Sequence, residues 1–247
     1  SMSNTGTLTN ASGLTLINDG NDGTLTNAGT LTNAGTLTNG ATLTNSGTLT
    51  NSGTLTNSGT LTFSNGSTFD NSGGTLTNAN GGRINSYVDD FYFNELTTGS
   101  VTLASGSTFA NYASMTNTGT LTNASGVTLV NSDTLTNSGL LKNRGTLTNA
   151  SGSTLTNDDD LRNESGGTLT NDGDLQNASN AFLSNYSGGT LTNTSGSTLT
   201  NDGDLWNESG GMLTNAGTLT NAHDMYNKGT LTNASGSTLT NDGDFYN

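Results

Sequence analysis

Leucine recurs at every sixth position through the strictest part of the chain, and threonine lies on both sides of it. The leucines of residues 23–58 are Leu25, Leu31, Leu37, Leu43, Leu49 and Leu55. Each is followed two residues later by a polar residue, which is asparagine throughout this stretch. A fixed short period that persists over many copies indicates a repeat architecture in which each unit stacks on its equivalents.

One copy, Thr24-Leu25-Thr26-Asn27, has the pattern of a very short β-strand. Threonine is β-branched and suits an extended backbone. Neighbouring residues of a strand point to opposite faces, so an inward Leu25 places Thr24 and Thr26 in solvent and turns Asn27 inward again. The pattern therefore predicts a strand of about four residues with one apolar and one polar side chain inside.

The two residues after each strand predict a tight bend. In Ala28-Gly29 we expect the glycine to supply a backbone conformation with φ > 0, which costs glycine little. A hairpin of such short strands would leave the leucines without a partner. Stacked coils give each strand its own copy as a neighbour and join the leucines into a continuous inner stack.

The asparagine persists even where the leucine is replaced, for example after Phe69, Phe109 and Met115. A buried amide must form hydrogen bonds. In stacked coils, equivalent asparagines lie above one another and can bond to each other and to the backbone of the turns. We therefore predict ladders of asparagine at the corners of the coils.

The spacing of the units indicates three strands per coil. Beyond residue 147 the chain mixes six-residue units with eight-residue units that contain an added Ser-Gly, and six units fill blocks of 44 or 40 residues. Three units per coil give coils of about 18–22 residues, whereas two would give a thin solenoid of the kind that commonly needs disulfides. The fold class predicted is all-β, a parallel β-helix (β-solenoid). Strict hexads resemble left-handed acyltransferase helices, but parallel crossovers are normally right-handed, so we expect a right-handed coil.

The whole chain, residues 1–247, is predicted to be a single β-solenoid with four parts. Residues 1–22 form atypical first coils, residues 23–78 the strict hexad coils, and residues 109–247 coils of mixed six- and eight-residue units. Residues 79–108 are an irregular excursion in which aromatic residues concentrate: Tyr87, Phe91, Tyr92 and Phe93. They predict either a binding surface or an irregular coil whose rings fill a wider core.

Composition and charge exclude several classes of function. The formal net charge is −14 and the sequence contains neither cysteine nor proline. A nucleic-acid-binding protein needs a basic face, and an anionic membrane surface repels an acidic protein. No apolar run reaches the length of a membrane span. We therefore expect neither a nucleic-acid partner nor membrane insertion.

No residues form a pattern expected of an enzyme. Asp-rich turns such as Asn201-Asp202-Gly203-Asp204 offer oxygen ligands for Ca²⁺, but they lack the glycine-rich nonapeptide of calcium-binding solenoids and suit solvated turns. His223 is the only histidine; it lies in a turn beside Asp224 and has no further ligand nearby in the sequence. We therefore predict no catalytic residue, no metal site and no cofactor.

The run of G-T-L-T-N-[AS] units resembles the β-helical shafts of bacterial surface adhesins, the class of filamentous haemagglutinin and autotransporter passengers. This resemblance implies a right-handed parallel β-helix that extends from the cell. It further implies an extracellular or cell-surface location and a partner such as a surface receptor, a glycan or a neighbouring cell surface. The expected function is a non-enzymatic, rigid shaft for adhesion or surface display.

The alternative is an ice-binding solenoid, because the Thr-Leu-Thr units also resemble the Thr-x-Thr arrays of insect antifreeze proteins. Three units per coil place threonine pairs in register through the strict hexads, where they would present a flat array to ice or ordered water. The expected members of that array are Thr24, Thr26, Thr42, Thr44, Thr60 and Thr62. Against this reading, Thr-Leu-Thr occurs on every side of the coil, whereas an ice binder usually perfects one face.

Overall fold

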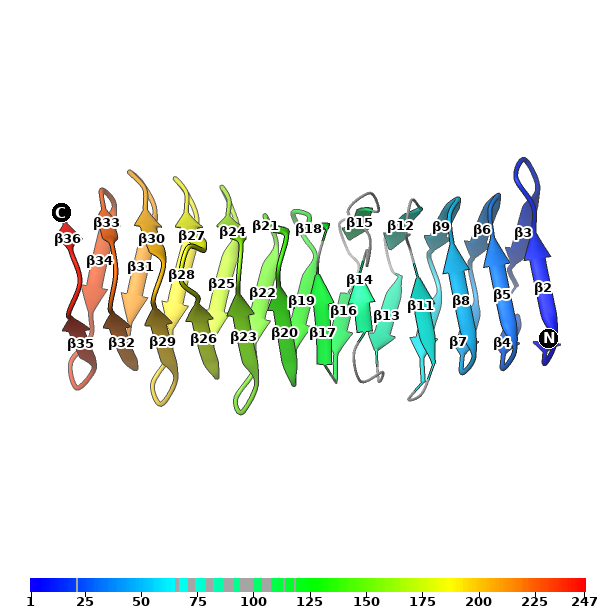
Figure 1. The fold of residues 1–247 in the computed structure, drawn as a ribbon, viewed down its shortest axis with the longest axis horizontal. Coiled ribbons are helices and arrows are strands. Elements are labelled where there is room, and N and C mark those ends of the chain that lie inside the picture. The colour runs from blue at the N-terminus through cyan, green and yellow to red at the C-terminus, as the bar shows by residue number, and fades with distance from the viewer. Residues whose placement is uncertain are drawn as a thin grey trace. The chain divides into compact units, whose positions relative to one another are not determined.

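The computed structural model describes residues 1–20, 22–64, 67–70, 74–78, 82–86, 91–93, 100–103, 108–112, 114–117 and 119–247. All regular structure in these residues is β-strand, in agreement with the predicted all-β class (Figure 1). No helix among them is long and apolar enough to cross a membrane. The chain divides into two compact units, residues 1–121 and residues 122–247, and each is described by itself.

In unit 1, every third strand belongs to the same sheet. One row contains β1 (Met2–Asn4), β4 (Thr24–Asn27), β7 (Thr42–Asn45), β10 (Thr60–Phe63), β13 (Arg83–Ser86) and β16 (Thr108–Asn111). A second contains β2 (Thr7–Asn10), β5 (Thr30–Asn33), β8 (Thr48–Asn51) and β11 (Thr68–Asp70). A third contains β3 (Thr15–Asn18), β6 (Thr36–Asn39), β9 (Thr54–Asn57), β12 (Thr75–Asn78) and β15 (Ser100–Leu103), while β14 (Phe91–Phe93) pairs with β17 (Ser114–Asn117).

Unit 2 likewise contains three rows of strands, and β18 (Thr120–Asn123) includes the division between the units. The first row contains β19 (Thr128–Asn131), β22 (Thr146–Asn149), β25 (Thr168–Asn171), β28 (Thr190–Asn193), β31 (Met212–Asn215) and β34 (Thr230–Asn233). The second contains β20 (Thr134–Asn137), β23 (Thr154–Asn157), β26 (Asp174–Asn177), β29 (Thr198–Asn201), β32 (Thr218–Asn221) and β35 (Thr238–Asn241). The third contains β21 (Leu140–Asn143), β24 (Asp160–Asn163), β27 (Phe182–Asn185), β30 (Asp204–Asn207), β33 (Met225–Asn227) and β36 (Phe245–Tyr246).

The strands pair in parallel with the strand one coil away, which confirms three strands per coil. Leu25 pairs with Leu43, and Leu43 with Leu61. Equivalent asparagines are 18 residues apart in the strict hexads, as between Asn27 and Asn45. The eight-residue units lengthen some coils of unit 2 to 24 residues, beyond the predicted 18–22.

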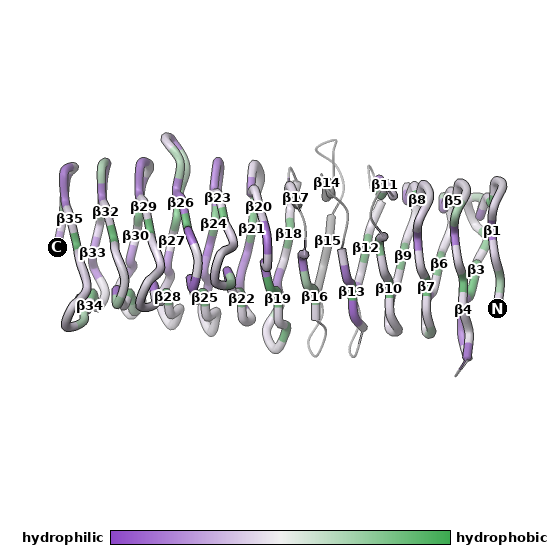
Figure 2. The backbone as a smooth tube through the Cα atoms, turned by 90° about the horizontal axis from the view of Figure 1, so that it is seen from below, coloured by the Kyte–Doolittle hydropathy of each residue, from purple (hydrophilic) through white to green (hydrophobic). Residues whose placement is uncertain are grey.

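The leucines form the core that the alternation predicts. Leu31, Leu43, Leu147 and Leu199 are fully buried, whereas Thr42 on the same strand as Leu43 is exposed. Within each unit, apolar and polar positions return at the same place in successive coils (Figure 2). Burying a leucine side chain contributes about 1.5–3 kcal/mol, so a stack of them stabilises coils that have few other apolar groups.

The predicted asparagine ladders are present in both units. The Nδ2 of Asn149 donates to the Oδ1 of Asn171 at 2.8 Å, and Asn171 repeats this bond to Asn193 at 2.8 Å. The same Nδ2 of Asn171 also donates to the carbonyl of Thr198 at 2.7 Å. The buried amides are therefore held both by one another and by the backbone of the next coil, which accounts for the persistence of this residue type.

The glycine of the six-residue units has a different role from the one predicted. Gly29, Gly47 and Gly53 do not have positive φ. A Cβ atom at Gly53 would lie 2.1 Å from the carbonyl oxygen of Gly35 in the preceding coil. These turns therefore need glycine because two backbones approach too closely for a side chain, and the φ > 0 explanation is wrong for them.

With the exception of Gly20, the glycines of positive φ among the described residues lie in the eight-residue units. Gly152 has φ of 78° in the turn that Ser153 N–H closes by donating to the carbonyl of Ala150 at 3.0 Å. The equivalent turn before β27 has Asn180 at φ of 67°, and asparagine is the non-glycine residue that tolerates this region best. The added Ser-Gly thus builds a β-turn outside the coil without disturbing the strands.

A matched pair of glycine substitutions tests the close approach of the coils. Gly53→Ala should destabilise the chain by roughly 1–3 kcal/mol, because the new methyl group meets backbone atoms that cannot move independently. Gly6→Ala should be nearly neutral, since no atom lies within 4 Å of the added Cβ and φ is not positive there. Chemical denaturation of both variants measures the difference, and equal midpoints would contradict the close-contact explanation.

Two parts of the sequence prediction stay predictions. The right-handed sense of the coils is one of them. The other is the organisation of residues 1–247 as one continuous solenoid with the four parts given above.

Candidate binding face

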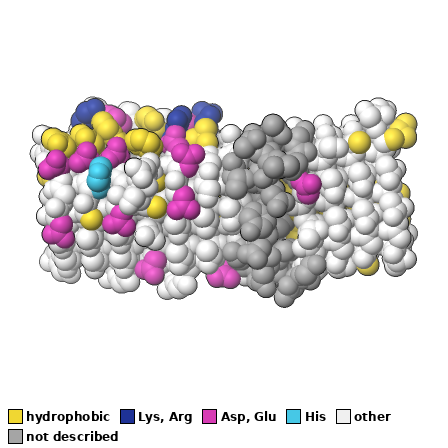
Figure 3. Space-filling model, in the orientation of Figure 1, with side chains coloured by type: hydrophobic (Ala, Val, Ile, Leu, Met, Phe, Trp, Pro, Cys, Tyr) yellow, Lys and Arg dark blue, Asp and Glu magenta, His cyan; other side chains and the backbone are white. Residues whose placement is uncertain are grey.

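One outward face of unit 2 departs from the Thr-Leu-Thr pattern. It lies on the third row of strands, where β24 reads Asp-Leu-Arg, β27 Phe-Leu-Ser, β30 Asp-Leu-Trp and β33 Met-Tyr. In Figure 3, charged and apolar side chains gather along the upper left edge of the view, while much of the rest of the visible surface of this unit carries neither kind. We call it the aromatic face and define it by Asp160, Arg162, Phe182, Ser184, Tyr186, Asp204, Trp206, Glu208, Tyr226, Lys228 and Tyr246.

Three rings on successive coils of the aromatic face stack on one another. The centroids of Trp206 and Tyr226 are 3.9 Å apart with planes 16° from parallel, and those of Tyr226 and Tyr246 are 4.8 Å apart at 7°. The in-register pairing of β30, β33 and β36 places these residues directly beside each other. Such aromatic pairs contribute about 0.5–1.5 kcal/mol beyond the burial of their area.

Acidic residues hold the tyrosines in this stack. The hydroxyl of Tyr226 donates to Asp224 at 2.9 Å, and that of Tyr246 donates to Asp244 at 3.1 Å. The hydrogen bond to Asp224 is the main reason that the pKa of Tyr226 rises to about 12. The bond to Asp244 likewise raises the pKa of Tyr246. Both phenols therefore stay neutral far above physiological pH.

Ion pairs fix the charged side chains around the rings. The Arg162 guanidinium donates to Asp160 through Nε at 2.8 Å and through a terminal nitrogen at 2.5 Å, and this bond raises the pKa of Arg162. Lys228 lies 3.6 Å from Glu208, with its ammonium 5.2 Å from the centroid of the Trp206 ring. Exposed pairs of this kind contribute little stability, so their main effect is to orient the groups.

A cavity of about 420 Å³ opens in the aromatic face where the column of large side chains is interrupted. In this column Arg162 pairs with Ser184, and Ser184 pairs with Trp206. The small serine leaves the space between the guanidinium and the indole open. The lining residues are Asp160, Arg162, Phe182, Ser184, Tyr186, Trp206 and Glu208.

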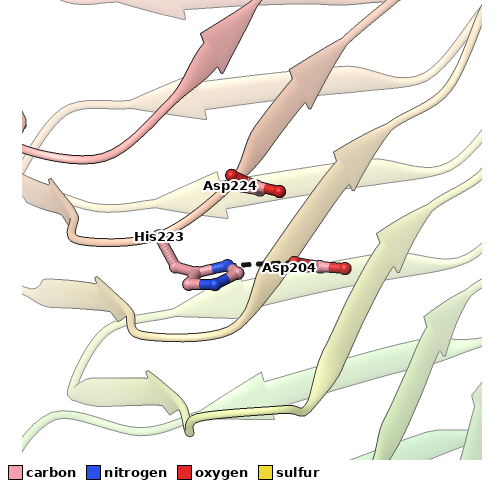
Figure 4. Close-up of side chains that lie close together, drawn as sticks. All are labelled: Asp204, His223 and Asp224. Atoms are coloured by element: carbon pink, nitrogen blue, oxygen red, sulfur yellow. Dashed lines mark hydrogen bonds and ion pairs between the residues drawn. The ribbon is translucent and has the colours of Figure 1, made fainter.

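The structure also brings His223 to two acidic residues, which sequence spacing alone did not show. The Nδ1 of His223 is 3.1 Å from a carboxylate oxygen of Asp204 in the preceding coil (Figure 4). Ligand atoms of Asp204, His223 and Asp224 lie within 4.8 Å of one another. Nitrogen and carboxylate ligands in this number suit a divalent transition metal, but His223 is largely exposed. A hydrogen bond between two surface side chains accounts for the arrangement equally well.

Of the aromatic residues singled out in the sequence, three are described by their backbone alone. Tyr87 is outside the described residues. Phe91, Tyr92 and Phe93 form β14, whose backbone pairs with Met115, Thr116 and Asn117 of β17. Their role as a binding site stays a prediction.

The threonine register expected for the strict hexads is confirmed. Thr42 pairs with Thr24 on one side and Thr60 on the other, and Thr44 pairs with Thr26 and Thr62. The same arrangement holds on the neighbouring row, where Thr30 pairs with Thr48. The array is thus a property of the repeat, shared by more than one side of the coil.

The aromatic face was missed in the sequence, although its signal was present. Most departures from Thr-Leu-Thr in residues 160–246 fall on every third unit, as in Asp160, Phe182 and Asp204, although Asp174, Gln176 and Met212 lie on the other two rows. Once three units make a coil, every third unit lies on one side. Sorting the outward residues by side would have gathered these residues on one face.

Comparison with known families gives a match to the haemagglutinin repeat over residues 1–111. The resemblance to the β-helical shafts of bacterial adhesins, seen in the G-T-L-T-N units, is thereby confirmed. The aromatic face lies outside the haemagglutinin repeat residues in the sequence.

The other comparisons add little to this result. Among solved structures, the chain is similar to a hyper-glycosylated fragment of TibA whose glycosylation TibC catalyses. The identity is 17%, the TM-score is 0.26, and the match covers 96% of this chain and 93% of that one. A likeness at this level carries no argument about function. No curated protein sequence matches the chain.

Proposed function

We propose that this chain is the rigid shaft of a bacterial surface adhesin and that the aromatic face of unit 2 is its contact surface. The haemagglutinin repeat supports a secreted or cell-surface protein with a structural, non-enzymatic role. The extracellular face of a bacterium is the location that suits such a shaft. The partner is a receptor, a glycan or a neighbouring cell on an opposing surface.

One observation carries the choice of contact surface. The chain has a single tryptophan, and it lies on the aromatic face within a stack of three rings, beside a cavity and between ion pairs. Tryptophan, tyrosine and arginine are the residues that dominate binding energy at protein interfaces. The other two rows of unit 2 carry mainly threonine at the outward positions.

An ice-binding role receives no support from the comparisons. The threonine register is real, but it occurs on more than one row of the coil. Strand-forming propensity alone explains threonine at outward positions. The threonine array therefore needs no ice-binding role to explain it.

Agglutination of erythrocytes by coated beads tests the proposed function. Many copies on one bead amplify weak single contacts, so beads coated with the whole chain should agglutinate the cells. The variant Trp206→Thr/Tyr226→Thr/Tyr246→Thr returns the aromatic face to the threonine of the repeat and should agglutinate much less. It should keep the fold, since threonine occupies the same outward position on the neighbouring rows.

The matched control changes three outward residues on another row: Thr148→Ser, Thr170→Ser and Thr192→Ser. It should agglutinate as well as the original chain, with circular dichroism showing that both variants are folded. Full agglutination by the threonine variant would contradict the assignment of the aromatic face as the contact surface. Loss of agglutination in the serine control alone would place the contact surface on the first row.

A further inference from the structure

The cavity of the aromatic face lies in a column of large side chains in which one position is occupied by a small residue. Arg162, Ser184, Trp206, Tyr226 and Tyr246 occupy equivalent positions in consecutive coils. Each has a large side chain except Ser184, which is a small residue and is 9% exposed. The serine therefore forms the floor of a slot, with the Arg162 guanidinium on one side and the Trp206 ring on the other.

The width of the slot follows from the fold. Arg162 and Trp206 are two coils apart, and parallel strands lie about 4.8 Å apart, so the two walls are separated by about 9.6 Å. A planar aromatic ring needs about 3.5–4.0 Å of contact distance on each side. It would fill roughly 7–8 Å and leave the slot loose. A puckered six-membered sugar ring is thicker than a planar ring and therefore fills the gap between the two walls better.

The chemistry around the slot also suits a sugar. The face of an aromatic ring is electron-rich, so it attracts the partially positive C–H groups on the apolar side of a pyranose. Carboxylates of Asp160 and Glu208 accept hydrogen bonds, while the hydroxyls of Ser184 and Tyr186 both donate and accept. A ligand pocket with a few polar groups set around an aromatic wall fixes both the position and the orientation of its ligand.

The balance of charge selects an uncharged sugar. Two carboxylates and one guanidinium line the slot, and the chain as a whole has a net charge of −14. An acidic sugar would meet unfavourable charge on approach and within the slot. We propose that the slot binds one uncharged pyranose ring, stacked on Trp206 and bonded through its hydroxyls to the polar rim. This inference rests on the proposed function, because it names the ligand class of the same contact surface.

Tryptophan fluorescence of the whole chain tests the proposal directly, since Trp206 is the only tryptophan. The probes are methyl glycosides of glucose, galactose, mannose and N-acetylglucosamine, each titrated to high millimolar concentration. At least one should change the emission in a saturable way. No saturable change with any of the four would overturn the proposal.

Two substitutions at the floor of the slot show where the probe binds. Ser184→Tyr fills the slot with a large side chain and should abolish the fluorescence response. The variant should fold, because Tyr226 and Tyr246 show that the column accepts tyrosine. Ser184→Val narrows the floor with a residue that suits strands and should weaken binding roughly tenfold or more. Thr192→Tyr, on the next strand β28, is the matched control and should respond as the original chain does.

Further outcomes separate the slot from the proposed function. An unchanged response in folded Ser184→Tyr would overturn the slot as the sugar site. A saturable response to p-cresol with none to the glycosides would also overturn it, in favour of an aromatic side chain from a protein partner. If Ser184→Tyr agglutinates erythrocytes normally while the Trp206→Thr/Tyr226→Thr/Tyr246→Thr variant does not, the slot fails and the aromatic face remains.

Discussion

Leu43→Asp is expected to unfold the coils around β7. Leu43 is fully buried between Leu25 and Leu61, so the new carboxylate would have no water and no cation near it. An unpaired buried charge is among the most destabilising changes known, and the loss should be roughly 4 kcal/mol or more. Thermal unfolding followed by circular dichroism measures the effect.

Thr42→Asp is the control for this change, because Thr42 precedes Leu43 on the same strand and is exposed. It introduces the same side chain into solvent and should shift the melting temperature very little. Hydrogen exchange should further show that Leu43→Asp loses protection chiefly in the neighbouring coils, since each repeat contacts only its neighbours. Similar melting temperatures for the two variants would disprove the inside and outside assignment.

Asn171→Ala should have the second large effect. The substitution removes the bonds to Asn149, Asn193 and the carbonyl of Thr198, all of them inside the coil or at its corner. Leaving a buried polar group unsatisfied costs about 1–3 kcal/mol. The free energy of unfolding in urea should fall by at least that amount.

Thr170→Ala tests whether the loss at Asn171 is specific to the corner. Thr170 lies on the same strand, is partly exposed and pairs with Thr148 and Thr192. Its substitution should change the free energy of unfolding by a few tenths of a kcal/mol, as is usual for surface sites. If both variants unfold at the same urea concentration, asparagine at the corner is only a turn former.

The main features of the fold could be predicted because each is local and repeated. The alternation in Thr24-Leu25-Thr26-Asn27 predicts which side chains of the strand point inward and which point outward. The repeat spacing predicts that each strand pairs with the equivalent strand of the next coil. The role of Gly53 could not be found in this way. Its requirement comes from Gly35 in the preceding coil, and a single unit contains no information about how closely two backbones approach.

The candidate site was harder to predict than the fold because its parts are far apart in the sequence. Arg162, Ser184 and Trp206 meet only through the coil length, which the eight-residue turns make irregular. The aromatic segment of residues 87–93 attracted notice because its rings are adjacent in sequence. Rings that are separated by a full coil, such as Trp206 and Tyr226, stack more closely than their spacing of 20 residues suggests.

The asparagine ladders give the coils of unit 2 a net alignment of side-chain amide dipoles. In the bonds from Asn149 to Asn171 and from Asn171 to Asn193, the earlier coil donates and the later coil accepts. The ladder from Asn163 to Asn185 runs the same way. Amide dipoles aligned in a row polarise one another and strengthen each bond. Each corner of unit 2 thus contains a row of amide dipoles that all point in the same direction along the coils. The outward side chains take no part in this row, so they can be substituted without interrupting the asparagine hydrogen bonds.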